Sequence, residues 1–194
     1  MSYTSICEAC PEISGGSIVL SHKATIHLLS LLQRVRGEFG FKLVGYRRNK
    51  REVRIIDIYV PRQEASSAHF EFSAEGNMDV AQAMLKGLKF VGWGHSHAGM
   101  NAFHSGTDLA TDERSVSMAK LPIASLTVNN NSLKWDGLLY HRLSCGRVAK
   151  IQASVKFPFD FSGDLAKLAS HNGRSVPVFD RNAFGRDEKE FEGE

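Results

Sequence analysis

Apolar and polar residues alternate along this chain in blocks that predict several short strands and a few helices. Runs rich in β-branched and aromatic residues, bounded by glycine, proline, asparagine or charged residues, predict strands. Apolar residues at helical spacing predict helices. The expected strands are residues 17–21, 39–46, 53–60, 68–72, 89–97, 122–128 and 133–143, and the expected helices are residues 21–37, 79–88 and 109–118. This mixture predicts an α/β (α+β) sandwich with a curved, mainly antiparallel sheet flanked by helices.

Several boundaries follow from individual residues. Ser21 is suited to cap the first helix, and Gly37 is suited to end it. The charged run 47–52 predicts a solvated hairpin loop between two strands, and residues 61–67 predict a polar loop. The second helix is expected to face inward through four apolar residues, namely Val80, Ala83, Met84 and Leu88.

Composition places the chain among globular proteins. With 194 residues and 42% hydrophobic content, one domain with an appendage is expected. The 24 basic and 21 acidic residues balance to a net charge of +3, which favours neither nucleic acid nor a membrane surface as a partner. No apolar run approaches the length of a membrane span, and residues 1–11 lack the apolar segment of a signal peptide.

Three cysteines, Cys7, Cys10 and Cys145, are an odd number. This argues against a secreted disulfide framework and predicts a cytoplasmic location. The Cys7-x-x-Cys10 pair has two readings: part of a disordered N-terminal segment, or half of a structural metal site shared between two chains.

The chain divides into three predicted parts. Residues 1–15 are expected to be a flexible N-terminal segment, residues 16–155 the folded domain, and residues 156–194 an extension. In the extension, the aromatic residues 157–161 should dock on the core. The polar, charged sequence after Asn172 predicts a mobile tail, with docking of a partner protein as the alternative.

The candidate chemistry centres on His95-Ser96-His97, followed by Ser105 and Asp108. Side chains two residues apart on a strand leave the same face, so both imidazoles should point the same way. Two imidazole nitrogens and one carboxylate, with a fourth position left open, are the ligand set of a catalytic zinc site. The pattern therefore predicts a zinc centre.

Other readings of these residues remain open at this point. Paired histidines on a strand can be ordinary core or surface residues, and Ser105-x-x-Asp108 is also a helix capping box. The opposite strand face carries Gly92, Gly94 and Ser96, which would let either backbone or a substrate come close. Other zinc sites also contain His-x-His, but this sequence lacks the Asp-His of the metallo-β-lactamases, the Glu of the cupins and a His-Glu-x-x-His helix.

The motif resembles the signature of the JAMM (MPN-plus) metalloproteases, which is His-Ser/Thr-His, seven residues, Ser, two residues and Asp, with a glutamate upstream. His95-Ser96-His97, Ser105 and Asp108 match it in type and spacing. Residues 36–45, which contain Glu38, are similar to the family's Glu-x-Gly-x-x-x-Gly stretch, with four residues instead of three between Gly40 and Gly45. Ala98 stands where many members have proline, as in bacterial, archaeal and phage types. The resemblance covers residues 16–142.

This resemblance implies an MPN (cytidine-deaminase-like) fold and specific roles. Zn²⁺ would be held by His95, His97 and Asp108. Glu38 would move protons between the attacking water and the leaving amine, and Ser105 would donate to the developing oxyanion. Without the resemblance, Glu38 would read as a solvated acid at a helix end.

The implied reaction is hydrolysis of an amide or isopeptide bond, with a ubiquitin or ubiquitin-like conjugate as the expected substrate. A phage or other peptide is an alternative substrate. A non-catalytic MPN scaffold is the rival from another class, and a nucleic-acid-associated protein of the RadC type has no support from the charge. Nearby, His104 is expected in a loop and Phe103 as that loop's anchor, while Trp93 is expected in the core or at the wall of a substrate groove.

Overall fold

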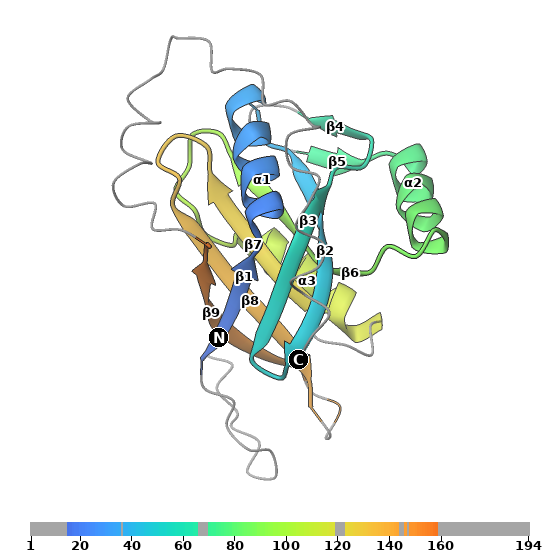
Figure 1. Cartoon of the computed structure of the whole chain (residues 1–194), viewed down its shortest axis with the longest axis vertical. Helices are drawn as coiled ribbons and strands as arrows, with labels where there is room; N and C mark the ends of the chain where they lie inside the picture. Colours follow the sequence, from blue (N-terminus) through green and yellow to red (C-terminus); the bar gives the residue numbers. More distant parts are fainter. Residues whose placement is uncertain are drawn as a thin grey trace.

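The computed structural model describes residues 15–35, 37–65, 70–118, 123–143, 146 and 148–158. Seven strands close into a barrel in the order β1-β3-β2-β6-β7-β8-β9 (Figure 1). Among the described residues, four of its seven neighbour pairs are antiparallel, and β1–β3, β1–β9 and β6–β7 are parallel. The strands are β1 (Gly16–Leu20), β2 (Gly40–Asn49), β3 (Glu52–Tyr59), β6 (Phe90–His97), β7 (Ile123–Asn129), β8 (Trp135–Arg142) and β9 (Val148–Lys156).

The predicted mixed fold with a curved, mainly antiparallel sheet is confirmed. Closure of the sheet was not predicted, and neither was β9. The first strand joins the two ends of the sheet because β1 pairs with both β3 and β9. Every barrel strand therefore has a neighbour on each side.

Three helices accompany the barrel in the described part of the chain: α1 (His22–Arg34), α2 (Ala74–Leu85) and α3 (Gly106–Met118). Figure 1 shows α1 against the barrel, and α2 to one side, beside a small hairpin. That hairpin pairs β4 (Gln63–Ala65) with β5 (Phe70–Phe72) as a separate two-stranded sheet.

Two apolar clusters hold these layers together. The larger cluster combines the barrel strands with Leu28 and Leu32 of α1, whose apolar stripe faces inward as its spacing predicted. The smaller cluster joins Val116 of α3 to Leu138 and Tyr140 of β8. This smaller cluster holds α3 against β8 of the barrel.

Several predicted boundaries were wrong for local reasons. The first helix ends at Arg34, and Val35 is already extended, so Gly37 is not its terminal glycine. The second helix begins at Ala74 because the Ser73 hydroxyl caps it by accepting from the Gly76 N–H at 3.0 Å. Its Met84 was expected inside but is 57% exposed.

Two predicted loops are shorter than expected. β2 continues to Asn49, so the charged run 47–52 belongs largely to strands, and Lys50 and Arg51 form the turn. β4 lies within the expected polar loop 61–67. In both cases cross-strand pairing organises polar residues that have no strand pattern of their own.

Some predictions fall outside the described residues. These are the N-terminal segment with Cys7 and Cys10, the position of Cys145, and the chain from residue 159 onward. Within the described range, Phe157 packs on Trp135 with ring centroids 4.9 Å apart. No helix in that range is long and apolar enough to cross a membrane.

Candidate metal centre

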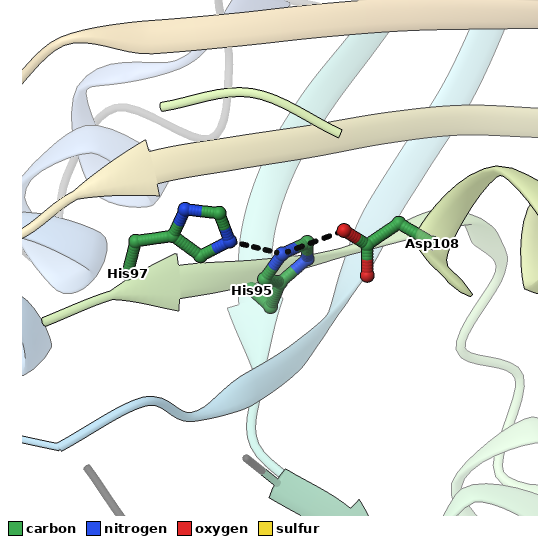
Figure 2. Close-up of side chains that lie close together, drawn as sticks. All are labelled: His95, His97 and Asp108. Atoms are coloured by element: carbon green, nitrogen blue, oxygen red, sulfur yellow. Dashed lines mark hydrogen bonds and ion pairs between the residues drawn. The ribbon is translucent and has the colours of Figure 1, made fainter. Parts of the chain in front are cut away.

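His95 and His97 lie at the end of β6, and both are almost fully buried. The strand alternation points both rings to one face, and their Nε2 atoms are 3.0 Å apart. Figure 2 shows His95 between His97 and Asp108, which approaches from α3. The Asp108 Oδ2 atom is 3.5 Å from Nε2 of His95.

The start of α3 fixes the Asp108 carboxylate. Its Oδ2 atom accepts from the Ser105 N–H at 2.7 Å, and the Ser105 hydroxyl accepts from the Asp108 N–H at 3.3 Å. This is the reciprocal capping box predicted from the sequence, although the helix begins at Gly106 rather than at residue 109. One carboxylate therefore caps its own helix and faces the histidines.

The donor set fits a zinc ion. The three ligand atoms lie within 4.8 Å of one another, and tetrahedral coordination at ~2.0–2.1 Å would separate them by about 3.3 Å. The carbonyl of Asn101 accepts from Nδ1 of His97 at 2.7 Å, so Nε2 of that ring carries a lone pair. Burial lowers the pKa of His95 to about 4, which keeps this ring neutral at pH 7 as metal binding requires.

Aromatic stacking holds the His95 ring. The Trp93 ring stacks on it with ring centroids 5.6 Å apart and an interplanar angle of 22°. The Phe70 ring of the hairpin stacks on it with centroids 5.7 Å apart and an angle of 27°. The His95 Nδ1 atom has no hydrogen-bond partner among the described residues. The indole N–H of Trp93 donates to the buried carboxylate of Asp112 at 2.5 Å. The His95 ring is therefore oriented by aromatic packing, whereas the His97 ring is oriented by its hydrogen bond to the Asn101 carbonyl.

Glu38 is buried just before β2. The register pairs Gly40, two residues further along the chain, with His95, and the Ser96 N–H donates to the Phe39 carbonyl at 2.9 Å. These contacts hold the backbone next to Glu38 against the end of β6. Glu38 is only 5% exposed, which differs from a solvated acid at a helix end.

Comparison with known families now gives a direct result. Residues 30–136, which are 107 of the 194 residues, match the family described as prokaryotic homologs of the JAB domain. The chain belongs to this family.

Two other comparisons add less. A search of curated proteins found no match for this JAB-domain chain. Among solved structures it is similar to the solution structure of protein DSY2949 from Desulfitobacterium hafniense, with 19% identity and a TM-score of 0.49. That match covers 75% of this chain and 97% of the other.

The geometry explains Gly40 and Gly45, the two glycines that follow Glu38 in this JAB domain. A Cβ on Gly40 would lie 2.1 Å from the Phe70 ring, and a Cβ on Gly45 would lie 1.9 Å from the Arg54 carbonyl oxygen at a β-bulge. The Gln63 side chain bonds both backbone groups of Gly40, at 2.7 and 2.9 Å. Gly40 thus leaves room for Phe70 of the β4–β5 hairpin, and Gly45 leaves room for the backbone of β3.

The small residues Gly94 and Ser96 on the opposite face of β6 are packed against Phe41 and the backbone of Phe39. A Cβ on Gly94 would meet the Phe41 ring at 2.5 Å, and the Ser96 hydroxyl accepts from the Phe39 N–H at 3.1 Å. The alternative that a substrate approaches this face is wrong, since the face is buried.

His104 is the loop residue that was expected, and it has two side-chain partners, of which Ser125 is buried and Asp136 is half-buried. Its Nδ1 atom is 2.8 Å from Asp136 Oδ2, and its Nε2 atom is 2.9 Å from the Ser125 hydroxyl. This Ser-His-Asp array has the order of a hydrolase triad, but Ser125 is fully buried in β7 and cannot meet a substrate. The array anchors the loop behind the metal ligands.

Sequence reasoning missed the contacts that Phe70, Asp112 and the asparagines 129–131 make around the site. Trp93 is the core residue that was expected, and its contact with His95 was not anticipated. Phe103 was expected to anchor its loop; it stands edge-on to His97 at 5.3 Å and remains 44% exposed. The one available signal was the run of three asparagines at 129–131, a composition that predicts a turn but not the contacts of its side chains.

Proposed function

We propose that this JAB-domain protein is a zinc-dependent peptidase or isopeptidase. The observation that carries the proposal is the cluster of the buried His95 and His97 with Asp108, together with the buried carboxylate of Glu38 just before β2. The family's description names a domain and not an activity. The proposal therefore rests on the chemistry of the site.

Zinc held by His95, His97 and Asp108 would supply Lewis acidity and lower the pKa of water toward ~7. Glu38 accepts a proton from the attacking water and returns it to the leaving amine. Its burial suits this exchange, because few waters compete for the carboxylate.

Ser105 is proposed to donate to the developing oxyanion. Its Oγ atom accepts from the Asp108 N–H, which leaves the hydroxyl hydrogen available to an acceptor in the site. A donor aimed at charge that develops in the transition state accelerates the chemical step.

The proposed substrate class is a ubiquitin-like protein joined through its extended C-terminal tail. The β4–β5 hairpin brings the Phe70 ring centroid to 5.7 Å from that of His95. The hairpin also provides a strand edge beside the site. An extended peptide can add to such an edge by backbone hydrogen bonds. An unmodified peptide is the second candidate, favoured by the exposed apolar side chains Met100 and Phe103 in the loop after His97.

The test is a cleavage screen with zinc-loaded protein against ubiquitin-like fusions and short peptides. His95→Ala and Glu38→Gln proteins serve as controls. Cleavage by wild type that both variants lose would support the proposal. Stoichiometric zinc in wild type without cleavage of any substrate would instead favour the non-catalytic scaffold.

A further inference from the structure

The turn that follows β7 contacts both sides of the metal centre. We define this Asn129–Asn131 turn as beginning at Asn129, the last residue of β7, and the side chains of its three asparagines bond segments that are far apart in the chain. Asn130 reaches the segment before Glu38. Asn129 and Asn131 reach the loop after His97.

Asn130 binds the chain on the N-terminal side of Glu38. Its Nδ2 group donates to the carbonyls of Val35 at 3.2 Å and Gly37 at 3.3 Å. The Ser96 hydroxyl donates to the same Gly37 carbonyl at 3.4 Å. The peptide unit next to Glu38 is thus held from two directions.

Asn129 and Asn131 bind the loop that orients His97. The Asn131 Nδ2 group donates to the Ala98 carbonyl at 2.8 Å, and the Asn129 Nδ2 group donates to the Met100 carbonyl. The next carbonyl along the loop, that of Asn101, is the acceptor for Nδ1 of His97. The Asn130 N–H also donates to the His97 carbonyl at 3.0 Å.

The chemistry of these amides allows one orientation of Asn129. Its Oδ1 atom accepts from the N–H groups of Asn131 and Ser132 and from the Ser132 hydroxyl, at 3.0, 2.6 and 2.8 Å. Its Nδ2 group therefore has to face the carbonyl of Met100. A carboxylate in the same place would lose that donor.

We propose that the Asn129–Asn131 turn is a positioning element for the catalytic centre. Asn130 sets the place of Glu38, and Asn129 and Asn131 set the loop that orients the ligand His97. The Glu38 half of the inference rests on the proposed function, whereas the His97 half needs only metal binding.

The His97 half is tested by zinc affinity, with Asn131→Ala as the main variant. Asn131 is exposed, so its replacement should leave the fold intact. We expect about a 10-fold loss of zinc affinity, the lower end of the effect of outer-shell partners. Asn77→Ala, at an exposed position of α2, is the matched control. Equal affinities in the two variants would overturn this half.

The Glu38 half is tested by a double-mutant cycle on a cleaved substrate. Asn130→Ala should lower kcat about 10- to 100-fold with bound zinc and KM unchanged, because a small displacement of a reacting group is costly. In a Glu38→Gln background the same change should cost nothing more. Additive losses would overturn the assignment. A Glu38→Gln protein with a normal rate would instead refute the proposed role of Glu38.

A readout that needs no substrate completes the design. Amide hydrogen exchange across residues 37–41 should be faster in Asn130→Ala than in Asn77→Ala, because the Gly37 carbonyl loses one of its two donors. Equal exchange in the two proteins would overturn the proposed role of Asn130, whatever reaction the protein catalyses.

Discussion

The Phe70 ring occupies the space that a side chain on Gly40 would fill. A Cβ built on Gly40 would lie 2.1, 2.5 and 2.8 Å from three ring carbons of Phe70. Gly40 pairs with His95 in the sheet, and Phe70 stacks on the His95 ring. The missing side chain therefore lets the hairpin reach a predicted metal ligand.

Gly40→Ala should displace Phe70 and disturb His95. Overpacking of a well-filled site costs about 1–3 kcal/mol, and the melting temperature and zinc affinity should both fall. Gly99→Ala is the matched control for stability, since nothing lies within 4 Å of a Cβ there. Melting curves and a zinc titration of the two variants decide the matter. Equal results would show that Phe70 moves aside without consequence.

The purified protein should hold one zinc per chain at the β6 site. His95→Ala and His97→Ala should each abolish stoichiometric zinc, because two of the ligands come from this one strand. Metal analysis after gel filtration is the measurement. Cys7→Ser/Cys10→Ser protein is the control for a second site. Full zinc content in the histidine variants would contradict the ligand assignment.

Glu38→Gln should separate chemistry from metal binding. The amide keeps the size of the side chain but cannot take up a proton, so turnover should drop ~10²–10⁴-fold while zinc stays bound. Steady-state rates and zinc content of the same preparation test this.

Ser105→Ala should also slow turnover with zinc retained, because an oxyanion donor acts in the transition state. If this variant lost zinc, the capping of the helix that carries Asp108 would be the more important role of Ser105.

Asp112 should contribute to stability through Trp93. Asp112→Ala would leave the buried indole N–H without its acceptor, at a cost of about 1–3 kcal/mol. Asp112→Asn keeps an oxygen at the same place and should cost less. Chemical denaturation of both variants gives the comparison. Tryptophan fluorescence should report the altered surroundings of Trp93, and an unchanged spectrum in Asp112→Ala would argue against the contact.

Acid should destabilise the protein through His141, far from the metal site. Burial, followed by the charges of Arg47 and Lys50, lowers the pKa of His141 to about 4 from 6.5. Between these values the unfolded chain binds a proton that the folded protein does not, so stability falls as the pH falls from 6.5 toward 4. The contribution is on the order of 1 kcal/mol per pH unit.

His141→Asn provides the control for this effect. Its side-chain oxygen can accept from Arg47, whose Nη2 atom is 3.3 Å from Nδ1 of His141, but it does not titrate. Its stability should vary less between pH 7 and pH 5 than that of wild type. Parallel pH profiles for the two proteins would rule His141 out as the cause.

Features that depend on local geometry could be predicted from the order of the residues alone. Two histidines two residues apart on a strand share a face, and a serine three residues before an aspartate forms a capping box at the start of a helix. These rules predicted how His95, His97 and Asp108 would be presented. The hydrophobic pattern also predicted most strands, because buried strands need apolar side chains wherever they pair.

The distant residues that surround His95, His97 and Asp108 could not be predicted in this way, because they meet only in the folded protein. Closure of the barrel through β1, the stacking of Phe70 on His95, and the contacts of Asn130 with Val35 and Gly37 join residues separated by 25 to 138 positions. Pairing of β2 with β6 joins Gly40, two residues after Glu38, to His95. No local pattern encodes such contacts, since each depends on how the whole sheet closes and on which side chains fill the space that remains.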